Sequence, residues 1–235
     1  MKPMPQSFEL SAALRGATWV AVVASLLTWQ AAPRAAPLPA KALPGDSVYQ
    51  LDVPLSDQAG HAAHLADWRG KPVLITMFYT SCQFVCPRII ETMKHTEQAL
   101  PGAWRGKVPA LLVTFDPARD DIATLRETAV ARGLDAPTWT LARTDARNVR
   151  KLAAALGIQY RELPGGDFNH TSAVFLLDAD GRIAAKTFTL GAADPAFVQR
   201  VRKTLREAEV NVNAKANAKA SANAKAAAQA MAKAQ

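Results

Sequence analysis

Apolar runs alternate with amphipathic stretches from about residue 46 to residue 209. Five apolar runs predict strands: Val73–Tyr79, Val108–Phe115, Thr138–Ala142, Ala173–Leu177 and Ile183–Phe188. Four amphipathic stretches predict helices: Pro87–Ala99, Ile122–Arg132, Ala146–Leu156 and Pro195–Glu209. Short strands are also expected before residue 70. The folded part of the chain is therefore a mixture of helices and strands.

Three turn and cap signals set the limits of these elements. Asp120 or Asp121 is placed to cap the second helix, and Gly157 follows the third as a stop signal. The turn formed by residues 178–181 (Asp-Ala-Asp-Gly) joins the last two strands as a hairpin.

The resulting order is β-α-β-α-β-α-β-β-α. Strands that alternate with helices predict a mostly parallel sheet with helices on both faces, and the closing hairpin adds an antiparallel edge. We therefore expect an α/β fold with a central mixed sheet flanked by helices, the arrangement of a thioredoxin-like domain.

The two ends of the chain differ from this body. Lys2 and Arg15 precede an uncharged run of 13 residues, Ala17–Trp29, which is short for a membrane span of roughly 20 residues. We interpret residues 1–32 as an export signal or an uncleaved membrane anchor, and 33–45 as a linker. Residues 46–209 form the predicted domain, and 210–235 are a basic, low-complexity tail rich in Ala, Lys and Asn.

The net charge of +8 belongs mostly to these ends. Residues 1–45 carry four basic and one acidic side chain, and the tail carries four lysines and no acidic residue, which leaves +1 for residues 46–209. A nearly neutral domain does not indicate nucleic-acid binding. The tail is expected to be solvated or weakly helical, and its charge suits an anionic membrane surface.

The two cysteines of the chain, Cys82 and Cys86, are separated by three residues and follow the first central strand. Pro87 suits the first turn of the next helix, whose positive end favours the thiolate form. Ligands of open α/β sheets bind at the carboxyl ends of the strands. In an oxidising compartment outside the cytoplasm this pair could perform thiol–disulfide exchange, bind a metal or form a structural bridge.

A histidine gives the pair a third candidate partner. His170 lies in a predicted loop that enters the strand Ala173–Leu177, which neighbours the thiol-bearing strand in a thioredoxin-like sheet. The other three histidines, His61, His64 and His95, are expected on the surface. Two thiolates and an imidazole suit Cu(I) or Zn(II), and the soft sulfur ligands favour copper.

Four segments together resemble the Sco/SenC family of copper-binding, thioredoxin-like proteins. They are Gly70-Lys71-Pro72, Tyr79 to Pro87 with both cysteines, Val113 to Asp120 with its Asp-Pro-Ala-Arg-Asp stretch, and His170 with Phe175 to Gly181. The resemblance implies copper ligands at Cys82, Cys86 and His170, and a role in assembling the dinuclear copper centre of cytochrome c oxidase. Two positions depart from the family pattern: Gln83 replaces a frequent proline, and Asn169 replaces a frequent aspartate.

The resemblance implies an exported metallochaperone that holds Cu(I), with Cu(II) as the alternative state. Its partners would be the copper-bearing oxidase subunit or another copper acceptor and a thiol reductant, in the periplasm or anchored to the inner membrane. The alternative is an exported thiol–disulfide oxidoreductase that uses a Cys82–Cys86 disulfide. The three-residue spacing and the absence of a proline in Thr171-Ser172-Ala173 favour the chaperone. Two further alternatives are less favoured. The sequence lacks the proline and arginine arrangement of a peroxiredoxin, and a structural zinc site would need a fourth ligand.

Overall fold

The structure is a computed structural model that describes residues 42–134 and 137–233. The predicted signal or anchor, residues 1–32, lies outside the described residues, as does most of the linker. Among the described helices, none is long and apolar enough to span a bilayer.

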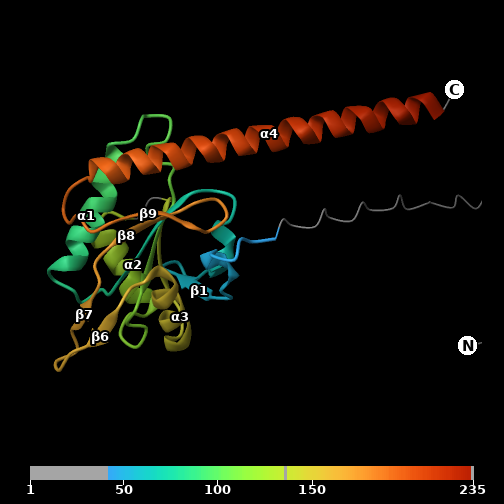
Figure 1. Cartoon of the computed structure of the whole chain (residues 1–235). Helices are drawn as coiled ribbons and strands as arrows, with labels where there is room; N and C mark the ends of the chain where they lie inside the picture. Colours follow the sequence, from blue (N-terminus) through green and yellow to red (C-terminus); the bar gives the residue numbers. More distant parts are fainter. Residues whose placement is uncertain (1–41, 135–136, 234–235) are drawn as a thin grey trace, which may run out of the picture. The chain divides into compact units, whose positions relative to one another are not determined.

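A seven-stranded sheet in the order β2-β1-β5-β4-β3-β8-β9 forms the centre of the fold (Figure 1). Its strands are β1 (Pro54–Asp57), β2 (Ala62–His64), β3 (Val73–Phe78), β4 (Ala110–Thr114), β5 (Trp139–Arg143), β8 (Val174–Leu177) and β9 (Ile183–Thr187). All residues of β3, β4 and β8 are buried, as their continuous apolar sequences predict. Short 3₁₀ turns, η1 (Val48–Gln50) and η2 (Leu65–Trp68), flank β1 and β2.

The sheet is mixed rather than mostly parallel. Of the pairings within it that the structure describes, only β3 with β4 and β4 with β5 are parallel. The pairs β1–β2, β1–β5, β3–β8 and β8–β9 are antiparallel. The prediction of a central mixed sheet is thus confirmed, whereas the emphasis on parallel strands was wrong because both flanks of the sheet are antiparallel.

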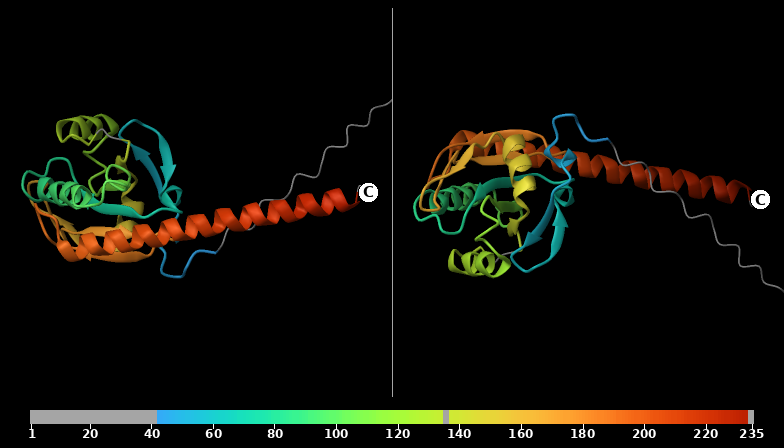
Figure 2. Two further views of the ribbon diagram at one scale, coloured as in Figure 1. Left: turned by 90° about the horizontal axis from the view of Figure 1, so that it is seen from above. Right: turned by 90° about the horizontal axis from the view of Figure 1, so that it is seen from below.

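Four helices accompany the sheet: α1 (Val85–Gln98), α2 (Ile122–Ala131), α3 (Ala146–Leu156) and α4 (Pro195–Lys233). Figure 2 shows α4 along the β8–β9 side and α2 toward β1. Asp121 caps α2 by accepting a hydrogen bond from the Thr124 amide, and Gly157 ends α3 in the left-handed conformation. Both limits agree with the sequence prediction.

Two elements differ from the prediction. The segment around His170 is not a loop: Tyr160–Glu162 (β6) and Phe168–His170 (β7) pair as a separate two-stranded antiparallel hairpin. Helix α4 continues beyond Glu209 to Lys233, and its residues from Glu209 to Ala232 are exposed. Alanine has the highest intrinsic helix propensity, so this sequence can be helical without an apolar stripe.

Candidate metal and thiol site

The two cysteines lie where the carboxyl end of β3 meets α1. Cys82 belongs to the connecting loop and Cys86 to the first turn of α1. Both thiols are free and buried, with 5% and 3% of their residue surface exposed. Burial leaves little of either cysteine accessible to a partner.

The thiols share one proton unequally. The Cys86 amide donates to the Cys82 sulfur over 3.3 Å, because the first turn of a helix has unpaired N–H groups. The hydrogen bond from the Cys86 side chain is the main cause that lowers the pKa of Cys82 to about 3, and His170 contributes to the shift against the effect of burial. The same bond between the thiols, together with burial, raises the pKa of Cys86. Cys82 is therefore the thiolate and Cys86 the proton donor.

His170 ends β7, and its ring packs on aromatic neighbours. The ring centroids of Phe115 and Tyr79 lie 4.9 and 6.0 Å from that of the imidazole. Nδ1 lies 3.2 Å from the carbonyl oxygen of Thr171. A carbonyl only accepts, so Nδ1–H donates to Thr171 and Nε2 is the ring nitrogen that is left for Cys82 or for a metal.

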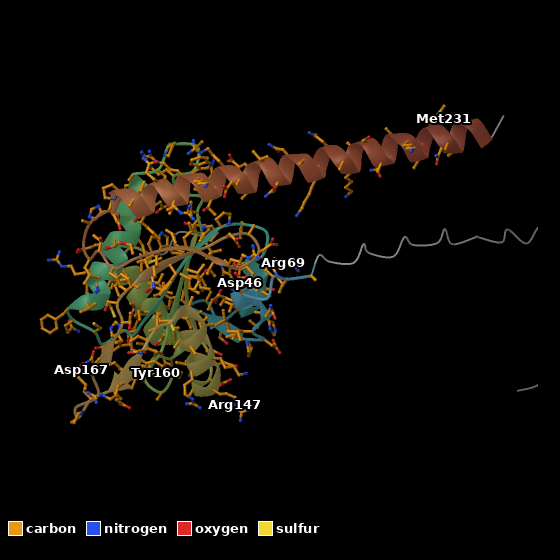
Figure 3. The ribbon with its side chains drawn as sticks, in the orientation of Figure 1. Asp46, Arg69, Arg147, Tyr160, Asp167 and Met231 are labelled. Atoms are coloured by element: carbon orange, nitrogen blue, oxygen red, sulfur yellow. The ribbon has the colours of Figure 1, made fainter. Side chains whose placement is uncertain are left out.

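A surface hollow of about 320 Å³ brings Cys82 and His170 together. Its lining also includes Tyr79, Phe168 and Asn169, but not Cys86. Figure 3 shows Asp167, another lining residue, on the hairpin together with Tyr160. Phe84, which stands between the two cysteines in sequence, borders the hollow and is 83% exposed.

The three predicted ligands are not assembled as a ready metal site. Within residues 42–134 and 137–233, no three His, Cys, Asp or Glu side chains are close enough together to hold an ion. The structure pairs Cys82 with Cys86 and Cys82 with His170. The other three histidines are exposed, as expected, and His61 and His64 pair with Asp57 and Asp52 at 3.1 Å.

Sequence reasoning missed the residues that support the site. Asp120, proposed as a cap, is buried and accepts hydrogen bonds from Thr80, at 3.1 Å from its amide and 2.5 Å from its hydroxyl. Asp116 forms a turn, because its carbonyl accepts from the Arg119 and Asp120 amides, and its carboxylate also pairs with Arg119. The adjacent charged residues Arg119 and Asp120 were the sequence feature that could have indicated this supporting role.

Comparisons with known proteins agree with the fold. The SCO1/SenC family matches residues 44–206. The human mitochondrial SCO2 homologue is 29% identical over 177 residues, covering 71% of this chain and 62% of its own length. The chain spans less than two thirds of the length of the curated relatives it matches.

Solved structures also share the fold. Bradyrhizobium japonicum ScoI with copper bound is 25% identical, with a TM-score of 0.54 over 66% of this chain and 97% of that one. BsSco, described as a member of the Sco family of cytochrome c oxidase assembly proteins with a disulfide switch, is 18% identical, with a TM-score of 0.55 over 67% and 91%. Since the family match covers more than half of the sequence, including both cysteines and His170, the chain belongs to the SCO1/SenC family.

Proposed function

We propose that this protein is an exported copper metallochaperone. It binds Cu(I) through Cys82, Cys86 and His170, and delivers the ion to the dinuclear copper site of cytochrome c oxidase or prepares the thiols of that site. The observation that supports this most directly is the shared hollow of Cys82 and His170, with the second thiol hydrogen-bonded to the first. The copper-bound ScoI of Bradyrhizobium supports copper as the bound ion, and the description of BsSco as a member of a cytochrome c oxidase assembly family supports oxidase assembly as the process.

The protonation states of the two thiols determine how many protons copper binding releases. Copper ligation requires both sulfurs as thiolates, and Cys82 already is one. Cys86 must lose its proton when the ion enters, so binding releases about one proton near neutral pH. His170 would bind the ion through Nε2, because Nδ1 donates to the Thr171 carbonyl.

Export would bring this site to the compartment that holds its proposed copper acceptor. The human relative is mitochondrial, and a Bacillus anthracis structural neighbour is a lipoprotein, which supports an extracytoplasmic or membrane-associated location. We propose that residues 1–32 direct export to the periplasm or anchor the chain to the inner membrane. The domain limits of 46–209 and the basic tail of 210–235 remain part of this proposal.

A competition titration with a chromophoric Cu(I) chelator tests the ligand set on the reduced protein. Cys82→Ser, Cys86→Ser and His170→Ala should each weaken binding of one Cu(I) per chain, while His64→Ala serves as the control because its ring is exposed and pairs with Asp52. If His170→Ala binds Cu(I) as tightly as the unaltered protein, the third ligand lies elsewhere.

The unequal thiols also support a second function, thiol–disulfide exchange. A low-pKa thiol next to a protonated one is the arrangement of an attacking and a resolving cysteine. Copper uptake before and after oxidation to the Cys82–Cys86 disulfide separates the two proposals. The chaperone must lose uptake on oxidation, whereas equal uptake in both states would reject copper ligation by the thiols.

A further inference from the structure

In the part of the chain that the structure describes, the hairpin that carries His170 does not pair with the central sheet. Strands β6 and β7 pair only with each other among the described strands. The position of the imidazole therefore depends on side chains that hold the hairpin against the rest of the domain.

Arg119 makes several contacts to this hairpin. Its guanidinium lies 5.4 Å from the centre of the Phe168 ring and 3.6 Å from the Glu162 carboxylate, one residue from each strand. It also lies against the hairpin turn, where a Cβ on Gly166 would come within 2.1 Å of its Nη1. These contacts are all to the hairpin of His170.

The opposite side of the guanidinium is anchored in the domain. Arg119 Nε forms an ion pair with Asp116, whose side chain is 5% exposed. The next residue, Asp120, holds Thr80, two positions before Cys82. One short turn after β4 thus contacts both the thiol loop and the histidine hairpin.

We propose that Arg119 is a positioning residue that fixes the His170 hairpin over Cys82, so that the imidazole can join the thiolates on Cu(I). This inference rests on the proposed function. A planar guanidinium can stack on Phe168 and pair with two carboxylates at once, which the point charge of a lysine cannot do. Supporting partners of this kind typically contribute roughly tenfold to a hundredfold in metal affinity.

A double-mutant cycle tests the role of Arg119. Cu(I) affinity is measured for the unaltered chain, Arg119→Ala, His170→Ala and the double variant, with Arg119→Lys as the conservative variant. Arg182→Ala is the matched control, because it removes an exposed arginine whose ion pair, with Asp46 at 2.8 Å, involves neither the hairpin nor the thiols. Thermal unfolding confirms that each variant folds.

We expect Arg119→Ala to lower affinity roughly tenfold and His170→Ala to cost much less in that background than alone. Arg119→Lys should recover part of the energetic coupling between residue 119 and His170. Arg182→Ala should change neither the Cu(I) affinity nor the effect of His170→Ala on it. Equal losses from His170→Ala in both backgrounds would overturn the proposal.

Hydrogen exchange on the metal-free protein separates this proposal from the copper proposal. Arg119→Ala should speed exchange of the hairpin amides, such as that of Leu163 bonded to Asp167, without changing exchange in β3. If His170→Ala leaves Cu(I) affinity unchanged, the copper ligand set fails, and unchanged exchange in the hairpin of Arg119→Ala then rejects the positioning role independently.

Discussion

The backbone amide of Cys86 donates a hydrogen bond to the sulfur of Cys82, with 3.3 Å between nitrogen and sulfur. The thiol in the loop therefore occupies the N-terminus of the helix that carries the other thiol. The helix dipole and this N–H both stabilise a negative sulfur. These backbone contributions add to the asymmetry that the hydrogen bond from the Cys86 thiol mainly causes.

This asymmetry predicts selective alkylation. Since the pKa of Cys82 is about 3, its thiolate fraction is nearly constant from about pH 5 to pH 8, and iodoacetamide should modify it first at a rate that varies little with pH. Mass-spectrometric mapping of the reduced protein measures this, with a cysteine peptide as the control. A rate that rises tenfold per pH unit, or earlier labelling of Cys86, would contradict the assignment.

Asp120 and Asp121 should affect the pH dependence of stability in opposite directions. Burial raises the pKa of Asp120, so its stabilising contribution is present at low pH and is lost as pH rises through the folded pKa. The Thr124 amide lowers the pKa of Asp121, whose contribution is present at higher pH and is lost as pH falls.

Urea unfolding from pH 3 to pH 7 compares Asp120→Asn with Asp121→Asn. The stability of Asp120→Asn relative to the unaltered protein should rise with pH, and that of Asp121→Asn should fall. Parallel curves for the two variants would show that Asp120 is not desolvated in the fold.

Two glycines with positive φ should respond differently to alanine. Gly157→Ala places a methyl group in open space, so only the left-handed conformation is costly, about 1 kcal/mol. At Gly181 a Cβ would lie 2.4 Å from the Tyr49 ring, so Gly181→Ala should cost clearly more, roughly 2–4 kcal/mol. Chemical denaturation of both variants checks the ranking, and equal losses would contradict the tight contact at Tyr49.

Deletion of Val210–Gln235 should leave copper affinity and the melting temperature nearly unchanged. The buried apolar stripe of α4, including Phe197, Val201 and Leu205, ends before this point, and the Trp104–Glu209 hydrogen bond is retained. Far-UV circular dichroism should nevertheless lose helical signal, because residues 210–233 belong to α4. Binding to anionic vesicles should weaken by up to about 1 kcal/mol per lysine. A large loss of copper binding would place the domain boundary later.

Much of the sheet could be predicted because buried strands have continuous apolar sequences. The continuous apolar run of β3 and the stripe of α3 identified those elements to within about one residue. The hairpin of His170 has no such apolar sequence. Its strands have three residues each, they are only partly buried, and they are held by aromatic side chains from distant positions such as Tyr79 and Phe115.

The sequence predicts a solvated or weakly helical tail but not the continuation of α4 into it, for a related reason. An apolar stripe reports where a helix packs, and that stripe ends near Leu205, whereas the backbone stays helical through alanine-rich sequence. The sequence predicts Asp120 or Asp121 as the cap of α2, but it cannot show that the Asp120 carboxylate points inward to Thr80. The proximity of Cys82 to Cys86 and His170 could be predicted from the sequence, but the contacts that support these residues could not.

The separate pairing of β6 and β7 means that backbone pairing and side-chain contacts hold two different parts of the site. The sulfurs depend on the junction of β3 and α1, while the nitrogen arrives on a short appendage outside the sheet. A library of hairpins between Tyr160 and Thr171 could therefore retune metal preference without altering the core strands, provided that the aromatic contacts of Phe168 are kept. The fold thus offers a fixed dithiol to which different third ligands can be fitted.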